Sequence, residues 1–328
     1  MSTYRALKGY SVKSVTSDPA NPKEGQIWYN DTLNKIRVNT IKPAVWASGG
    51  NLNNTRGQLF GSGTQTAAIA AGGLHPPEGT VAHSEEYNGS SWTEGNNLNT
   101  ARRVAATGGP QTAAFATGGF TPPNTNATEE YDGSSWTNGG NLGTARRDFA
   151  GAGTQTAGVA FAGYVSAVSA LTEEYNGSSW TASNAMSTSK YGNAGCGTQT
   201  AAFSFGGISP PASPSLLVTT ENYDGTNWTT SSHNLGTGRY SVECSTAGTQ
   251  TATIAFGGLP GGNGVTTTEQ YDGSSWTTVA ALATGRSYLA GAGTSAAALA
   301  VGGGNGPFLN ATEEWTDIVN AVTSLDVS

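Results

Sequence analysis

The stretch Thr-Glu-Glu-Tyr-Asp-Gly-Ser-Ser-Trp at residues 128–136 decides the fold, because close copies of it recur along the chain. It is followed by Asn-Leu-Gly-Thr-Ala-Arg-Arg at 141–147 and by Gly-Thr-Gln-Thr-Ala at 153–157. The tryptophan returns every 44 to 48 residues, at Trp46, Trp92, Trp136, Trp180, Trp228 and Trp276. A period of this length is typical of propellers and solenoids. It overrides the expectation of two domains that 328 residues would otherwise raise.

Each repeat contains the signals of four short strands. One follows the basic residue, as at 147–152, and a Gly-Thr-Gln-Thr turn leads to a strand of small apolar residues, as at 201–205. A third strand, such as 128–131, ends at an Asp-Gly or Asn-Gly pair that favours a tight hairpin turn. The fourth strand carries the tryptophan. Four antiparallel strands in about 44 residues match the size of a propeller blade.

The order of Gly-Gly, Glu-x-Tyr-Asp, Trp and Thr-x-Arg resembles the Kelch repeat over residues 46 to about 315. The resemblance implies blades whose first strand lines a central channel and whose tryptophan strand is outermost. The Trp46 strand precedes the first copy, whereas the last copy has no fourth strand after 312–315. We therefore predict an all-β, six-bladed Kelch-like propeller, whose last blade combines residues 286–316 with an outer strand at 43–48.

The chain divides into three parts. Residues 1–42 are expected to form an attachment segment, in which 25–38 alternates apolar and polar residues like a β-hairpin. Residues 43–316 form the propeller, and residues 317–328 form a tail that either adds an edge strand or hangs free. The first ten residues lack the apolar core of a signal peptide, and no run is long enough for a membrane span. We therefore expect neither secretion nor membrane insertion.

Charge limits the class of partner. The net charge is −7, with +4 in residues 1–45 (seven Lys/Arg against three Asp/Glu) and −11 in residues 46–328 (eight against nineteen). Nucleic-acid binding requires clustered Lys and Arg, so we expect no nucleic-acid partner. Cys196 and Cys244 belong to no metal-binding spacing, and both are expected to be free thiols in strands.

A basic residue recurs ten or eleven positions after each tryptophan, at Arg56, Arg102, Arg146, Lys190, Arg239 and Arg286. A ring of cations near a channel could bind an anion. A glutamate recurs in step with the cations, however, so we predict structural ion pairs. The expected partners are Glu86, Glu130, Glu174, Glu221, Glu269 and Glu313.

None of the candidate enzyme motifs in the sequence has the full set of residues that its chemistry requires. The Asp-Gly-Ser-Ser-Trp phrase is similar to the Asp-box of sialidases, but Asp132 precedes Trp136 by four residues rather than five. The carboxylates that do not repeat are scattered singly, at Glu78, Glu94, Asp148 and Glu243. Glycoside hydrolysis needs a facing pair. His75 and His83 flank one loop without a third ligand. We predict no enzyme, no metal site and no cofactor.

The loops between second and third strands differ in every repeat, whereas the other turns are nearly constant. Variable loops on a rigid scaffold are typical of a binding surface, although unconstrained drift would also produce them. The candidate binding residues are His75, Pro76, Phe120, Tyr164, Ile208, Leu216, Leu259 and Phe308. In a lectin-like protein, Phe120, Tyr164 and Phe308 would stack on sugar rings.

Residues 18–30, with the phrase Gly-Gln-Ile-Trp-Tyr-Asn, resemble the opening of many virion proteins of tailed phages, particularly marine phages. The resemblance implies a virion protein made in the host cytoplasm. Its N-terminal segment would dock on other tail or capsid proteins through Ile27, Trp28, Tyr29 and Ile36. The propeller would then contact a glycan or receptor of the host. Two alternatives remain: a lectin-like polysaccharide-binding propeller, and a general Kelch-like interaction module unrelated to virions.

Overall fold

The computed structural model describes residues 4–7, 10–209 and 215–325. Those residues form β-strands and one 3₁₀ turn at Gln111–Ala113, with no α-helix among them. Accordingly, none of their helical segments has the length and apolar character needed to cross a membrane. The chain divides into two compact units, residues 46–315 and residues 1–45 with 316–328.

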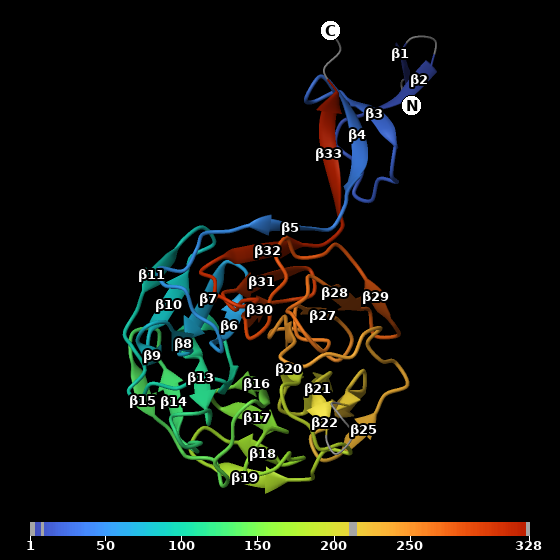
Figure 1. The fold of residues 1–328 in the computed structure, drawn as a ribbon. Helices are drawn as coiled ribbons and strands as arrows, with labels where there is room; N and C mark the ends of the chain where they lie inside the picture. The colour runs from blue at the N-terminus through green and yellow to red at the C-terminus, as the bar shows by residue number, and fades with distance from the viewer. Residues whose placement is uncertain (1–3, 8–9, 210–214, 326–328) are drawn as a thin grey trace. The chain divides into compact units, whose positions relative to one another are not determined.

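In the described part of the larger unit, six four-stranded sheets surround a common axis in a propeller-like arrangement (Figure 1). The first sheet contains β6 (Phe60–Thr64), β7 (Ala67–Ala71), β10 (Ser84–Tyr87) and β11 (Trp92–Glu94), and the second contains β12 (Ala106–Gly108), β13 (Phe115–Thr117), β14 (Thr128–Tyr131) and β15 (Trp136–Asn138). The third contains β16 (Ala150–Thr154), β17 (Ala157–Phe161), β18 (Thr172–Tyr175) and β19 (Trp180–Ser183), and the fourth contains β20 (Ala194–Thr198), β21 (Ala201–Phe205), β24 (Thr220–Tyr223) and β25 (Trp228–Thr230). The fifth contains β26 (Glu243–Cys244), β27 (Thr253–Phe256), β28 (Thr268–Tyr271) and β29 (Trp276–Thr278). Short hairpins in two loops pair β8 (Leu74–His75) with β9 (Gly79–Thr80) and β22 (Ile208–Ser209) with β23 (Ser215–Leu216).

The remaining sheet combines strands from both ends of the repeat region. Its order is β30 (Ala290–Gly293), β31 (Ala297–Val301), β32 (Thr312–Thr316) and β5 (Val45–Ser48). The strand that carries Trp46 therefore lies in the sheet of the last repeat, as the incomplete first and last copies of the repeat predict.

The innermost strands consist largely of glycine and alanine because they approach one another closely around the axis. A Cβ atom on Gly291 would lie 2.1 Å from the carbonyl oxygen of Cys244 in the preceding sheet. On Gly151 it would lie 2.8 Å from the carbonyl oxygen of Thr107. Real Cβ atoms do not come so close, so these positions require glycine.

Most repeated polar residues join neighbouring sheets. The Trp92 indole N–H donates to the Thr312 hydroxyl (2.9 Å), which links the first repeat to the last. The turn glutamine does the same: Gln155 Nε2 donates to the carbonyl oxygens of Ala114 and Tyr131 in the preceding sheet (2.8 and 2.6 Å). The repeated phrases are therefore assembly contacts, which explains why they vary so little.

A buried ion pair closes each repeat, as predicted, but three of the expected glutamates are wrong. The pairs are Arg56–Glu85, Arg102–Glu129, Arg146–Glu173, Lys190–Glu221, Arg239–Glu269 and Arg286–Glu313. Side chains alternate along a strand, so the adjacent Glu86, Glu130 and Glu174 point to the other face. There they accept hydrogen bonds from the tyrosine hydroxyl of the next sheet, as from Tyr175 to Glu130 (2.5 Å).

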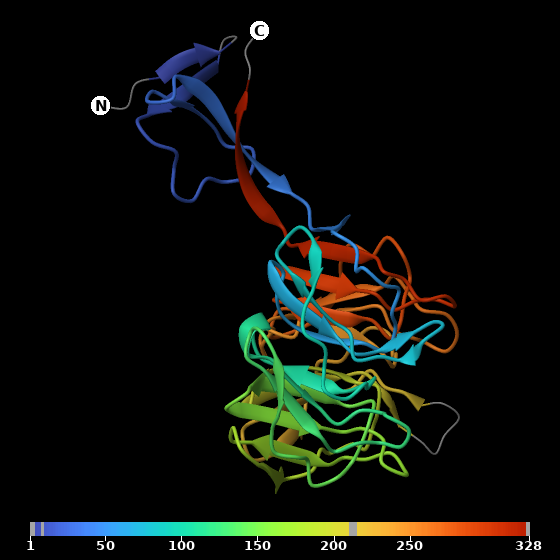
Figure 2. The same ribbon diagram turned by 90° about the vertical axis from the view of Figure 1, so that its left-hand side faces the viewer.

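The smaller unit is a five-stranded sheet in the order β1 (Tyr4–Leu7), β2 (Tyr10–Val15), β3 (Ile27–Asn30), β4 (Lys35–Lys42) and β33 (Val319–Leu325). The predicted hairpin is confirmed, because Ile27 pairs with Val38 and Asn30 with Lys35. Strand β33 pairs antiparallel along β4 (Figure 2). Of the two alternatives for residues 317–328, an added edge strand or a free tail, the first is therefore the one observed, because β33 (Val319–Leu325) is an edge strand of this sheet.

Asp18 organises the loop before β3. Its Oδ1 atom accepts hydrogen bonds from Asn30 Nδ2 and Trp28 Nε1, both at 2.8 Å. Its Oδ2 atom lies 3.2 Å from Arg37 Nη2. The hydrogen bonds from Asn30 and Trp28, followed by the charge of Arg37, hold the pKa of Asp18 below its usual value. The phage-like phrase of residues 18–30 therefore has a structural role in this unit.

Candidate binding site at the mouth of the central channel

A belt of left-handed backbone surrounds one end of the channel. In each repeat the residue two positions after the buried cation has φ between 49° and 63°. These belt residues are Gln58, Val104, Asp148, Gly192, Ser241 and Tyr288. Five hydrogen bonds of 2.7–3.0 Å, each from one belt amide to the carbonyl oxygen of the preceding repeat's belt residue, link them. This conformation strains a β-branched residue such as Val104, and such strain concentrates at functional sites.

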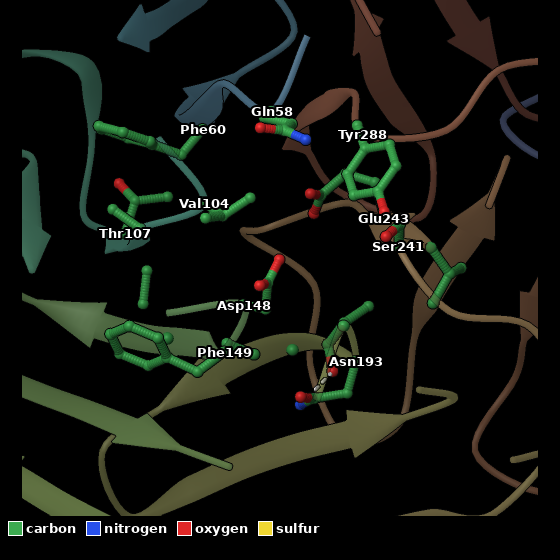
Figure 3. Close-up of a pocket in the computed structure, with 18 of the residues that line it drawn as sticks. Gln58, Phe60, Val104, Thr107, Asp148, Phe149, Asn193, Ser241, Glu243 and Tyr288 are labelled. Atoms are coloured by element: carbon green, nitrogen blue, oxygen red, sulfur yellow. Dashed lines mark hydrogen bonds between the residues drawn. The ribbon is translucent and has the colours of Figure 1, made fainter. Parts of the chain in front are cut away.

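The belt encloses a cavity of about 90 Å³. Its lining includes all six belt residues together with Thr107, Phe149, Asn193 and Glu243 (Figure 3). The belt position is occupied by a different residue in each repeat, although a basic residue always lies two positions before it. Asn193 is buried, and its Oδ1 atom has no hydrogen-bond partner among the described residues. Around the cavity, the backbone conformation of the belt is therefore the same in each repeat, whereas its side chains differ from repeat to repeat.

Two carboxyl groups face this cavity, which the sequence did not predict. Asp148 and Glu243 belong to different repeats and both line the cavity (Figure 3). Burial raises the pKa of Glu243 to about 7. Burial also raises the pKa of Asp148, against the opposing charge of Arg147, whose Nε atom donates to Asp148 Oδ2 at 3.2 Å. The signal that could have found Asp148 is its place at the one position that never repeats.

Replacing Glu243 with glutamine is expected to remove a pH dependence of stability. The pKa of Glu243 is about 7 in the folded chain and near 4.5 when unfolded, so the folded state holds its proton more tightly. This contribution is complete below about pH 4.5 and is lost as the pH rises to about 7. Urea denaturation of both proteins across that range measures it. A wild-type-minus-variant difference that does not fall with rising pH would contradict the prediction.

Arginine and aromatic side chains alternate beside the belt. The Arg147 guanidinium carbon lies 4.9 Å from the ring centres of both Phe120 and Tyr164. Arg103 lies 5.1 Å from Phe120, and Tyr164 meets Tyr191 edge to face at 5.8 Å. Backbone bridges join Arg103 to Phe120 and Arg147 to Tyr164. We call these five residues the arginine–aromatic arc; it places two predicted binding residues, Phe120 and Tyr164, beside the channel mouth.

The other predicted loop residues lie elsewhere or inside. Ile208 and Leu259 are only 9% exposed, so the expectation that they face solvent is wrong. They directly follow a glycine pair, and backbone bridges tie them to the residue after the buried cation. Leu216 is half-buried opposite Ile208. Half-buried Phe308 covers the backbone of Gly57.

The first variable loop contains a pair of histidines. Pro76 is exposed, while His75 Nδ1 lies 2.7 Å from the Thr55 carbonyl oxygen. Glu78 lies 3.5 Å from the Nε2 atom of His75 and 3.6 Å from that of His83. Within the part of the chain that the structure describes, no group of three His, Cys, Asp or Glu side chains is arranged to hold a metal ion.

The predicted docking residues of the smaller unit divide between two faces of its sheet. Trp28 is 1% exposed and bonded to Asp18, so it belongs to the core rather than to a docking surface. Ile36 is also buried, at 8%. Ile27 is 40% exposed and shares a sheet face with half-buried Tyr29, because side chains two residues apart point the same way.

The opposite end of the channel is wider and more uniform. A cavity of about 410 Å³ is lined there by the repeated Gly-Thr turns, including those at 63–64, 153–154 and 197–198. Most of these turns contribute the same Gly-Thr pair, with Pro110 and Ala247 as departures, so the side chains around this end differ little in chemistry. The two ends of the channel thus differ in kind: one is assembled from repeated turns and the other from residues that do not repeat.

Comparison with known proteins adds no assignment to this geometry. No protein-family model matches the chain, and no curated protein matches it. The belt, the cavity and the arginine–aromatic arc therefore carry the functional argument.

Proposed function

We propose that the chain is a non-enzymatic binding protein of a tailed-phage virion, built on a six-bladed Kelch-like β-propeller. The six four-stranded sheets support the blade count. The place of β5 beside β32 supports closure by the N-terminal outer strand. Bonds between the first and last repeats, from Trp92 to Thr312 and from Gln65 to the Trp315 carbonyl oxygen, support a closed ring.

One observation carries the binding role: the side chains that differ between repeats gather at one mouth of the channel. The belt and the arginine–aromatic arc lie there, while all six repeated basic residues form buried ion pairs within the fold. A rigid scaffold that displays individual side chains at a cavity is a common design for a binding site. In this proposal the loop face contacts a partner or the host surface.

The smaller unit would attach the chain to other tail or capsid proteins. Its sheet carries exposed Ile27 and Val319 on one face, because Ile27 pairs with Val38 and Val319 with Lys42, whose side chains point the same way along β4. Exposed Ile41 lies on the opposite face. Residues 1–45 also carry a net charge of +4 against an acidic propeller. Both features support a separate attachment surface on this unit, and hence a location in the virion.

Replacing Ile27 with glutamate is expected to abolish incorporation of the chain into phage particles. The side chain is already 40% exposed, so the change should leave the fold intact while placing a charge on the proposed docking face. Mass spectrometry of purified particles measures incorporation, and circular dichroism of the free protein verifies folding. Leu33→Glu, an equally drastic change at a 50% exposed position in the hairpin turn, serves as the control. Absence of the unaltered chain from particles would refute the virion role.

A further inference from the structure

Resting on the proposed function, we infer that Arg103 and Arg147 bind the carboxylate groups of an acidic polysaccharide at the channel mouth. A carboxylated saccharide would be recognised here through the charge, the geometry and the surroundings of these two arginines.

Arg103 and Arg147 are the two basic residues that lie outside the six repeated ion pairs; Arg147 is paired instead with its neighbour Asp148 (3.2 Å), and Arg103 forms no ion pair with any residue that the structure describes. Residues 46–328 contain eight Lys and Arg residues, and six of them form the buried ion pairs. The other two are Arg103 and Arg147, both half-buried and both within about 5 Å of the Phe120 ring centre. Asp148 offsets the charge of Arg147, so an incoming carboxylate would mainly compensate the charge of Arg103, with Arg147 as its neighbour across the Phe120 ring.

Contacts with aromatic rings restrict the orientation of both guanidinium groups, which favours binding of a planar anion. Arg147 is fixed by Phe120 and Tyr164, and its Nε and Nη1 atoms donate to Asp148 and Asn124 at 3.2 Å. Its Nη2 atom remains available. The Arg103 guanidinium makes no hydrogen bond to any residue that the structure describes. A fixed guanidinium with free N–H groups suits two-point recognition of a carboxylate, which a lysine ammonium cannot provide.

The surroundings favour a sugar over a peptide as the bearer of the carboxylate. Peptide ligands usually insert apolar anchors into pockets, but Ile208 and Leu259 on this face are buried in the fold. The groups next to the arginines are instead the phenols of Tyr164 and Tyr191, and the cavity adds Asn193, Ser241 and other polar side chains. Such groups exchange hydrogen bonds with hydroxyls, as a saccharide would require.

Arg103 is the residue to test, because its guanidinium bonds to no other described side chain. We expect the full-length chain to bind oligogalacturonate in calorimetry and to bind a neutral galactan of the same length far more weakly. Arg103→Met should weaken oligogalacturonate binding about 10- to 100-fold. The affinity of Arg103→Lys for oligogalacturonate should be close to that of the methionine variant, because lysine keeps the charge but lacks the planar set of N–H donors of a guanidinium group. Thr181→Met, on exposed outer strand β19, should bind like the unaltered chain.

Three results would overturn the inference. Equal affinity of the unaltered chain and Arg103→Met for oligogalacturonate would remove Arg103 from the site. Failure of the unaltered chain to bind oligogalacturonate would exclude the uronate ligand. Equally tight binding of poly-L-glutamate, with the same sensitivity to Arg103→Met, would assign the site to an acidic peptide. Incorporation of each variant into particles, measured in parallel, keeps these failures separate from a failure of the virion role.

Discussion

Replacing Trp46 with alanine is expected to lower the free energy of unfolding by about 3–5 kcal/mol, in the range of large aromatic truncations in a core. The side chain is 7% exposed and anchors the one outer strand that comes from the other end of the repeat region. Its ring centre lies 5.1 Å from that of Phe256 and 5.5 Å from that of Trp315. Its indole N–H donates to the Thr268 hydroxyl at 3.0 Å. One residue thus joins the fifth and sixth sheets.

Guanidinium denaturation followed by circular dichroism measures this loss. Ser48→Ala, at an exposed position of the same strand, should change stability by less than about 0.5 kcal/mol. Limited proteolysis gives a second readout, since a loosened β5 should be cleaved near residues 43–48 before the rest of the propeller. A Trp46→Ala protein as stable as Ser48→Ala would show that β5 contributes little to the ring.

Replacing Arg102 with methionine is expected to cost about 3–5 kcal/mol, because it leaves the carboxylate of Glu129 buried without its cation. Arg102 Nη2 and Glu129 Oε1 lie 2.6 Å apart, and both side chains are almost completely buried. Arg102 also donates to the carbonyl oxygens of Gly118 and Ala127. The pair therefore ties together three segments of one repeat.

A double variant separates the charge from the packing. The double variant combines Arg102→Met with Glu129→Gln. Its glutamine side-chain oxygen can still accept a hydrogen bond from the backbone N–H of Asn99, which donates to Glu129 Oε2 at 2.6 Å in the unaltered chain. We expect this protein to recover part of the loss, because no unpaired charge remains inside. If the double variant is less stable than Arg102→Met alone, the penalty does not arise from the isolated carboxylate.

The sequence predicts the sheets well because every repeat gives the same landmarks in the same order. The placement of Trp46 in the last sheet follows from one missing strand at each end. The glutamates were harder, since Glu129 and Glu130 are adjacent and side-chain alternation allows only one of them to meet Arg102. A single repeat does not show which one, but Glu221-Asn222 and Glu269-Gln270 keep only the first acid, which identifies it as the recurring partner.

The channel mouth was not predictable from any one repeat. Asp148 and Glu243 lie two repeats apart in the sequence, and both line one cavity because the first strands of the sheets surround it. Read along the chain, each is an isolated acid without a partner. The pattern that could have located Asp148 is a position at a fixed distance, two residues, after the repeated basic residue that is occupied by a different residue in every repeat.

The pairing of β33 with β4 gives the propeller two covalent connections to one sheet, at residues 45–46 and 315–316. Lys42 and Val319 are paired neighbours in that sheet, so the two connections leave it side by side. A single protease cut in either connection would leave the other intact. The two units are thus joined by a double covalent connection, and the chain would have to be cut twice before they could separate.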